Sequence, residues 1–164
     1  MQESLNSLNQ AKKVKIKMKK LFIYYSLSGN GDFVANLFKE NGYDIRKVET
    51  VKGLPKVFFF AMLSGGFQAG MKKKAKLKEF DQDISKYDEV VIGSPIWNAR
   101  IAPAVNTLLA TLDFSNKEVS FVFCSGSGAG KNAEKRIKKE FPNANITFLK
   151  QPKDHPEELK KLTW

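Results

Sequence analysis

The sequence predicts an α/β fold, a three-layer sandwich in which a five-stranded parallel sheet lies between two layers of helices. Short apolar runs alternate along the chain with stretches whose apolar residues repeat at helical spacing, and this alternation is typical of right-handed βαβ units. Three runs, "LFIYY", "EVVIG" and "VSFVF", are almost continuous in β-branched and aromatic residues, as strands buried on both faces are. The expected strands are residues 21–25, 43–48, 89–93, 119–123 and 145–149.

Two stretches between these strands predict helices with recognisable ends. In residues 31–41, apolar side chains at helical spacing share one face, and Gly42 follows as the expected C-cap. In residues 103–112, Pro103 suits the first helical position, and valine and leucine side chains repeat at helical spacing. Both helices therefore connect expected strands of the sheet.

Three further segments are expected to be helical. Residues 129–141 place apolar side chains on one face, and the lysines and arginine of this segment are expected to form a solvated surface. A short helix from about Pro156 ends the chain at Trp164. Residues 51–78, which contain several phenylalanines followed by "MKKKAKLK", are interpreted as a helix with irregular ends.

The chain of 164 residues is expected to form one domain, since a domain of this length can bury a full core. Part of its net charge of +11 lies near the start, where residues 1–20 carry six lysines and one glutamate. We expect residues 1–18 to be a basic, disordered extension and residues 19–164 to be a single domain. Met18, which lies just before the first strand, is a candidate for the natural start of the protein.

The composition argues against several classes of protein. The one cysteine, Cys124, allows no internal disulfide and fits a reducing cytosol, so we expect a cytoplasmic location. The longest apolar run, residues 57–63, is far shorter than the roughly 20 residues of a membrane helix. His155 is the sole histidine. We therefore expect neither a histidine-based catalytic triad nor a metal site.

Glycine and serine are concentrated between the first strand and the first helix, in "YSLSGNGDF". A helix N-terminus leaves four backbone N–H groups free and carries roughly half a positive charge. Serine hydroxyls and a glycine-flexed backbone at such a position can hold a phosphate. The alternative is a plain strand-to-helix turn with Ser28 or Asn30 as the N-cap. A bound phosphate also requires that Asp32 point away from it.

Two further loops follow the third and fourth strands. The first, "GSPIWNARIAP", contains Trp97, which its turn-forming and polar neighbours predict to be exposed; burial in the core is the alternative. The second, "CSGSGAG", is small and rich in backbone donors. The overlapping stretch "SGSGAGKN" is not a nucleotide P-loop, because that motif needs glycine where Ser125 stands and serine or threonine where Asn132 stands. The three loops together suit a flat aromatic ring with a phosphate tail.

These stretches resemble the flavodoxin-like family of FMN-binding proteins, over about residues 20 to 150. "YSLSGNGDFVA" is similar to the family's phosphate loop, "GSPIWNARIAPAVNTLL" to the loop and helix after its third strand, and "FCSGSGAG" to the loop after its fourth strand. The resemblance implies strand order 2-1-3-4-5 and FMN as the cofactor at the carboxyl ends of the strands, an arrangement for which flavodoxin is the standard example.

The resemblance also implies three groups of cofactor-binding residues. The first loop would hold the FMN phosphate. The second would wrap one side of the isoalloxazine ring, with Trp97 against it, and the third would border the other side with backbone groups. The residues are Ser26, Leu27, Ser28, Gly29, Asn30 and Gly31; Ser94, Pro95, Ile96, Trp97, Asn98, Ala99 and Arg100; and Ser125, Gly126, Ser127 and Gly128.

The sequence departs from the family's pattern in both outer loops. The family often has a hydroxylated residue where Gly31 stands, so one hydrogen bond to the phosphate is expected to be missing. The loop after the fourth strand has no aromatic residue, unlike that of electron-carrier flavodoxins, which leaves one flavin face open unless residues 58–67 fold over it. Arg100 is a candidate to stabilise the negative charge of reduced FMN; a surface arginine at a helix start is the alternative.

Three functions follow from this interpretation. The chain transfers electrons through FMN either as a carrier between redox partner proteins or as a small oxidoreductase that accepts hydride from NAD(P)H and reduces a quinone or similar acceptor. The third is a non-redox protein that binds another phosphorylated ligand, or a scaffold whose basic extension docks on nucleic acid. No aromatic residue is interleaved with the lysines of that extension, which argues against nucleic acid. The sequence does not indicate an oligomeric state.

Overall fold

A computed structural model describes residues 18–51 and 74–164 of the chain, and five parallel strands form one sheet within them. The strands are β1 (Lys20–Tyr24), β2 (Asp44–Lys47), β3 (Glu89–Trp97), β5 (Glu118–Ser125) and β6 (Asn145–Lys150). They lie in the order β2-β1-β3-β5-β6. This is the predicted order 2-1-3-4-5, so the predicted fold class is confirmed. A short sixth strand, β4 (Arg100–Ile101), pairs antiparallel with the end of β3.

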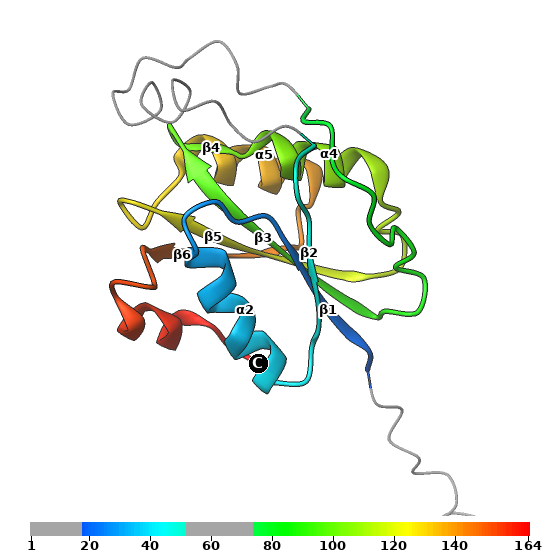
Figure 1. Cartoon of the computed structure of the whole chain (residues 1–164), viewed down its shortest axis with the longest axis horizontal. Helices are drawn as coiled ribbons and strands as arrows, with labels where there is room; N and C mark the ends of the chain where they lie inside the picture. Colours follow the sequence, from blue (N-terminus) through cyan, green and yellow to red (C-terminus); the bar gives the residue numbers. More distant parts are fainter. Residues whose placement is uncertain (1–17, 52–73) are drawn as a thin grey trace, which may run out of the picture.

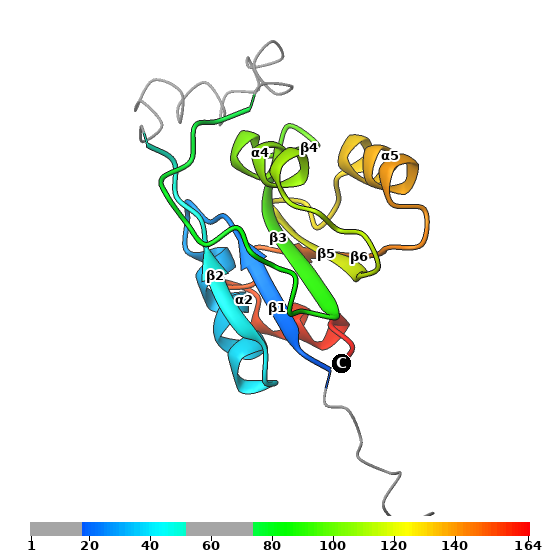
Figure 2. The same cartoon turned by 90° about the vertical axis from the view of Figure 1, so that its right-hand side faces the viewer.

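Helices cover both faces of the sheet (Figures 1 and 2). On one face lie α4 and α5, and on the other lie α2 and a C-terminal 3-10 helix, η1. Their bounds are Asn30–Glu40 for α2, Pro103–Thr111 for α4, Lys131–Glu140 for α5 and Pro156–Lys161 for η1. The predicted final helix is therefore present only as a 3-10 helix, and it ends before Trp164. No helix in the described part of the chain has the length and apolar composition needed to cross a membrane.

The central strands β1, β3 and most of β5 are buried on both faces, as their composition predicts, whereas the edge strands β2 and β6 are mostly half-buried or exposed. In β1, Leu21 and Ile23 belong to the core on the side of α4 and α5, whereas Phe22 and Tyr24 belong to the core on the side of α2. All four side chains are nearly inaccessible to solvent. Because β3 and β5 alternate in the same way, one apolar core lies on each side of the sheet.

The helix α2 fits its sequence pattern closely. Val34, Ala35 and Phe38 are buried, and the ring of Phe38 stacks on Phe22 of the sheet with 4.2 Å between centroids. Gly42 follows the helix with φ +81°, a conformation that glycine adopts without strain. The predicted end of this helix is thus confirmed, and the amphipathic face fixes the helix against β1.

The connection from β2 to β3 is only partly described, since residues 52–73 lie outside the described residues. Most of the predicted helix 51–78 falls there. The described end of that segment is not helical, because Leu77 forms an isolated antiparallel bridge with Thr50. Leu77, together with the downstream Phe80, packs against the core on the side of α4.

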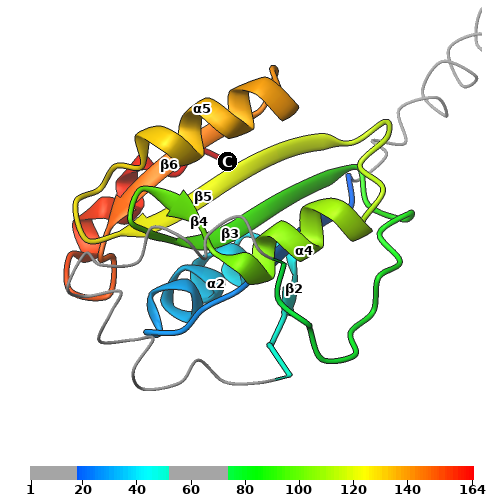
Figure 3. The ribbon, with the colours of Figure 1, turned by 90° about the horizontal axis from the view of Figure 1, so that it is seen from above.

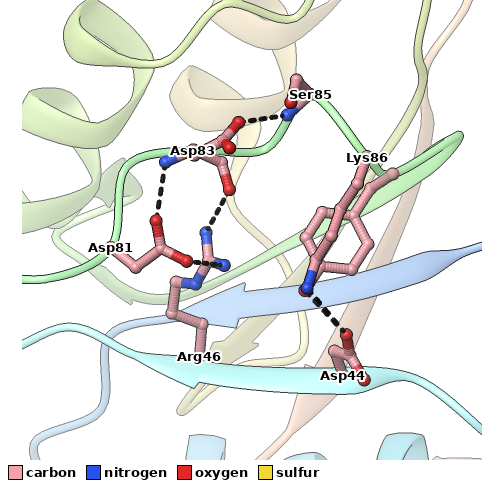
Figure 4. Close-up of polar contacts among 7 residues, drawn as sticks. Asp44, Arg46, Asp81, Asp83, Ser85 and Lys86 are labelled. Carbon is pink, nitrogen blue, oxygen red and sulfur yellow. Dashed lines mark hydrogen bonds and ion pairs between the residues drawn. The ribbon is translucent and has the colours of Figure 1, made fainter.

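A network of charged side chains fastens this connection to the edge strand β2 (Figure 4). The Arg46 guanidinium on β2 donates to the Asp81 carboxylate at 2.7 Å and to the backbone carbonyl of Asp83 at 3.2 Å. On the same strand, Asp44 lies 3.9 Å from the Lys86 ammonium. These contacts hold the loop against β2, the edge strand of the sheet.

Candidate functional site

The loops that follow β1, β3 and β5 lie at the same edge of the sheet, which is also where α2 begins (Figure 3). The strand register brings them together: Tyr24 is paired with Gly93, and Pro95 is paired with Cys124. A small pocket opens at this edge. It is lined by residues of the β1–α2 loop, by Gly93, Ser94 and Pro95 of β3, and by Cys124 of β5.

The β1–α2 loop presents hydrogen-bonding groups around the start of α2. Gly29 adopts φ +87° at the N-cap, and the backbone N–H of Gly31 donates to the Ser26 hydroxyl at 3.2 Å. The Asn30 side-chain amide donates to the Ser28 hydroxyl at 3.1 Å. Hydroxyl groups and backbone N–H groups at a helix N-terminus favour an anion, so the chemistry of this loop fits a phosphate. We call residues 26–31 the phosphate loop from here on.

The structure explains why glycine stands at position 31. A Cβ atom there would lie 2.8 Å from Cβ of Ser26, which is closer than such atoms approach, and 3.0 Å from Cδ2 of Tyr24, which is tighter than most contacts. A hydroxylated residue at this position would therefore push Ser26 out of place. The departure from the family's pattern is a packing requirement of this chain.

The Asp32 carboxylate, in the first turn of α2, is held by neighbouring side chains. It accepts a hydrogen bond from the Tyr24 hydroxyl at 2.8 Å and forms a 2.7 Å ion pair with Lys47 of β2. Burial alone would raise the pKa of Asp32, but the hydrogen bonds with Lys47 and Tyr24 outweigh it and hold the pKa below its ordinary value, with a smaller contribution from Ser26. The carboxylate is thus compensated by a cation, which reduces its repulsion of an anion in the loop.

The stretch predicted to be a loop after the third strand is mostly strand. β3 continues to Trp97, and a two-residue turn leads into β4. Asn98 and Ala99 form this turn with φ +47° and +60°, the left-handed pair that a tight hairpin requires. The prediction that residues 93–103 form a loop is therefore wrong over residues 93–97, because the chain turns only after Trp97.

Trp97 is buried, contrary to the prediction that it is exposed. Only 8% of its surface is accessible, and its ring meets Tyr25 edge-on with 6.1 Å between centroids. The polar neighbours that suggested exposure form the tip of the hairpin, while the indole packs in the core on the side of α4. The Tyr25 hydroxyl has a raised pKa, chiefly because of burial.

Two residues predicted for the second group line the pocket, Ser94 and Pro95. Ser94 is buried, and its hydroxyl donates to the Pro95 carbonyl at 2.9 Å and accepts from the Ala102 N–H at 3.3 Å. That hydroxyl therefore fixes the chain just before α4. Five predicted residues of this group lie on the hairpin and do not line the pocket: Ile96, Trp97, Asn98, Ala99 and Arg100. Ile96 is buried, Asn98 is exposed, and Ala99 and Arg100 are half-buried.

The loop after β5 folds back on itself. The Ser125 hydroxyl accepts from the Ala129 N–H at 3.0 Å, and Gly128 adopts φ +72° against Lys150 of β6. Gly126 and Ser127 are exposed. These four predicted residues border the same edge of the sheet without lining the small pocket, whereas Cys124 does line it. Burial raises the pKa of the Cys124 thiol to about 12, so the thiol stays protonated near neutral pH.

The structure brings Lys153, which the sequence analysis did not select, to the phosphate loop. Its backbone N–H donates to Oδ1 of Asn30 at 3.0 Å. Its ammonium Nζ lies 3.8 Å from the position that a Cβ atom on Gly29 would occupy. The signal was available, because Lys153 follows the carboxyl end of β6 and the carboxyl ends of parallel strands share one edge of a sheet.

Comparison with protein families and solved structures places this architecture among known proteins. The family described as Flavodoxin matches residues 68–161. A protein from Bacteroides uniformis ATCC 8492 described as a flavoprotein is 25% identical, with a TM-score of 0.66 over 79% of this chain and 86% of that one. A Bacteroides eggerthii DSM 20697 protein described in the same way is 22% identical, with a TM-score of 0.69 over 87% and 96% of the two chains.

A third solved structure contains a bound cofactor. It is a flavoprotein from Lactobacillus acidophilus NCFM in complex with FMN, 22% identical, with a TM-score of 0.57 over 79% of this chain and 89% of that one. A comparison with curated proteins gave no significant match. Since the family match covers more than half of the sequence, and the fold and strand order agree with it, the chain belongs to the flavodoxin family.

Proposed function

We propose that the chain binds FMN at the edge where the β1, β3 and β5 loops meet, and that it uses this cofactor to transfer electrons. One observation carries the proposal: every residue of the phosphate loop except Gly29 lines a single pocket at the N-terminus of α2, together with the ends of β3 and β5. Membership of the flavodoxin family supports it. The FMN complex of the Lactobacillus acidophilus protein supports the same cofactor.

The groups of the phosphate loop fit the anionic end of FMN. The hydroxyls of Ser26 and Ser28 and the backbone N–H groups at the start of α2 would hold the phosphate. Leu27, whose side chain is 42% exposed beside the pocket, offers an apolar surface to the rest of the ligand. Bound FMN supplies the redox chemistry, accepting one electron or the two electrons of a hydride.

The rest of the proposed site holds the flavin by its edges. Pro95 lines the pocket, and Gly126 and Ser127 present exposed backbone near the other side. Trp97 does not stack on the ring in this proposal, because its indole is packed in the core. It stabilises the end of β3 instead, and so fixes the position of Pro95.

Reconstitution with FMN tests the cofactor. We expect the purified protein to bind one FMN, with quenching of flavin fluorescence and a shifted visible absorption spectrum. The double variant S26A/S28A removes two hydroxyl donors and should weaken binding by about tenfold or more, since a hydrogen bond to a charged group contributes about 1.5–3 kcal/mol. The matched variant Ser115→Ala, in the turn before β5, should bind FMN like the wild type. An unchanged flavin spectrum at saturating FMN would reject the proposal.

A reductase is the form of electron transfer that the described loops favour. The loop of residues 125–130 carries no aromatic side chain, so this loop itself leaves a hydride donor free to approach the ring. Stopped-flow mixing of the FMN-loaded protein with NADPH measures this directly. Reduction of the flavin within seconds, followed by reoxidation with a quinone, is the expected result. Flavin that is reduced only by a protein donor would instead identify an electron carrier.

A further inference from the structure

We propose that Lys153 is the residue by which this site recognises the doubly charged phosphate of its ligand. The inference rests on the proposed FMN site and adds a specificity determinant to it. A helix N-terminus and hydroxyl groups bind an anion without a full positive charge. Lys153 supplies that charge from the far end of the chain, in the turn between β6 and η1.

The turn that carries Lys153 is held in place on both sides. Within it, the backbone N–H groups of Asp154 and His155 donate to the Gln151 carbonyl at 2.8 and 3.0 Å. Toward the site, the N–H of Lys153 donates to Oδ1 of Asn30, a residue of the phosphate loop, at 3.0 Å. The side chain therefore leaves from a fixed backbone, and a substitution at this position removes the ammonium without removing the backbone hydrogen bond.

The ammonium of Lys153 is available to a ligand. Its side chain lies along Gly29, with Cδ and Nζ each 3.8 Å from the position of a Cβ atom on that glycine. In the described part of the chain, no carboxylate forms a salt bridge with Lys153, whereas Asp32, the acidic residue of the α2 first turn, is paired with Lys47 at 2.7 Å. Among residues 18–51 and 74–164, no carboxylate in contact with Lys153 therefore compensates its charge.

An ammonium beside the phosphate loop should distinguish FMN from riboflavin by the charge of the phosphate. FMN carries a phosphate that is mostly dianionic near neutral pH, and riboflavin carries the same ring and ribityl chain without it. An exposed cation at about 4 Å from a unit negative charge contributes about 1 kcal/mol even at the dielectric constant of water. Lys153 should therefore strengthen binding of FMN about five- to tenfold and leave binding of riboflavin unchanged.

Flavin titrations of the wild type and three variants test this role. Lys153→Gln removes the charge, Lys153→Arg keeps it, and Lys160→Gln removes one charge from η1 as a matched control. The dissociation constants of FMN and of riboflavin are measured by fluorescence quenching at low and at high salt, and unfolding midpoints confirm that each variant folds.

The expected pattern has three parts. Lys153→Gln weakens FMN about five- to tenfold at low salt, the loss shrinks as salt screens the charge, and riboflavin is unaffected. Lys153→Arg and Lys160→Gln bind FMN within about twofold of the wild type, since both leave a cation beside Gly29. The role of Lys153 is rejected if Lys153→Gln binds FMN as tightly as the wild type, or loses FMN and riboflavin equally. Wild-type protein that binds neither flavin overturns the proposed function and this inference together.

Discussion

Gly31 offers a sharp test of how the phosphate loop is built. From family resemblance alone, a larger residue at this position would be expected to be neutral or to add a contact with the phosphate. The structure indicates the opposite, because a Cβ atom there would lie 2.8 Å from Cβ of Ser26 and 3.0 Å from Cδ2 of Tyr24. Neither atom is the free end of a flexible side chain, so Gly31→Ala must displace the loop or the end of β1.

The size of the effect follows from three contributions. Alanine gains up to about 1 kcal/mol over glycine in a helix. Overpacking costs about 1–3 kcal/mol. Displacing Ser26 weakens the hydrogen bond from the Gly31 N–H to its hydroxyl, which costs about 1 kcal/mol more. We therefore expect Gly31→Ala to lower the free energy of unfolding by about 1–3 kcal/mol and to weaken FMN binding.

Urea unfolding followed by circular dichroism measures the stability of the Gly31→Ala protein, and flavin titration measures its binding. Gly126→Ala is the matched control, since the nearest atom to its added methyl group is Nε2 of Gln151 at 4.0 Å, and it should change stability by less than about 0.5 kcal/mol. Adding Ser26→Gly to Gly31→Ala should recover part of the lost stability. A Gly31→Ala protein that is as stable as the wild type and binds FMN equally well would refute the packing argument.

Three further outcomes are expected. Trp97→Ala should lower the free energy of unfolding by about 3 kcal/mol or more in urea titrations, as truncation of a buried tryptophan does. A Trp97→Ala protein that is as stable as the wild type but binds flavin more weakly would indicate that Trp97 contacts the flavin ring after all. Burial raises the pKa of Cys124 from 9.0 to about 12, so above pH 9 the unfolded state releases this proton before the folded state does, and the free energy of unfolding falls with rising pH. Cys124→Ala has no thiol to release a proton, so its free energy of unfolding should rise relative to that of the wild type between pH 8 and pH 10.5. If the two free energies of unfolding differ by the same amount at every pH, burial does not raise the pKa of Cys124. Arg100→Gln should make the second reduction step of bound FMN less favourable if Arg100 stabilises the reduced anion, and spectroelectrochemical potentials that match the wild type would assign Arg100 to the surface of the hairpin.

The sequence was sufficient to predict the centre of the sheet because β1, β3 and most of β5 are buried on both faces. Continuous apolar runs such as "LFIYY" and "VSFVF" have few alternatives once helical patterns separate them. The order of the strands came from the family resemblance, and the structure confirms it. The left-handed Gly42 after α2 was predictable for a local reason, since glycine adopts that conformation without strain.

The length of β3 was not predictable from local signals, because Pro95 indicates a turn in most contexts. Proline is tolerated here for a tertiary reason. The register of β1 with β3 ends where Tyr24 meets Gly93, and the last bond on that side runs from the Tyr25 N–H to the Gly93 carbonyl. Two residues further along β3, Pro95 faces the same side, where none of the described residues forms a ladder partner that would need the N–H that proline lacks. The burial of Trp97 followed from this extension.

The position of Lys153 was not predictable from the sequence for a different reason. The phosphate loop was identified by residue types that are adjacent in sequence, whereas Lys153 reaches it through the fold, across a separation of 123 residues from Asn30. Only the rule that the carboxyl ends of parallel strands share one edge of the sheet indicates that Lys153 lies near the phosphate loop. Side-chain direction within the turn after β6 could not be derived from that rule, because it depends on the bond between Asn30 and the Lys153 backbone.

The bond between Asn30 and Lys153 has a consequence for biosynthesis. Translation delivers the start of the chain first, and domains begin to fold as they emerge from the ribosome. The amide of Asn30 gains its partner only after a further 123 residues have been synthesised. A nascent chain halted before residue 153 would carry the serines and glycines of the loop but not the lysine, so on this proposal it should capture a phosphorylated flavin less tightly than a chain that includes residue 153.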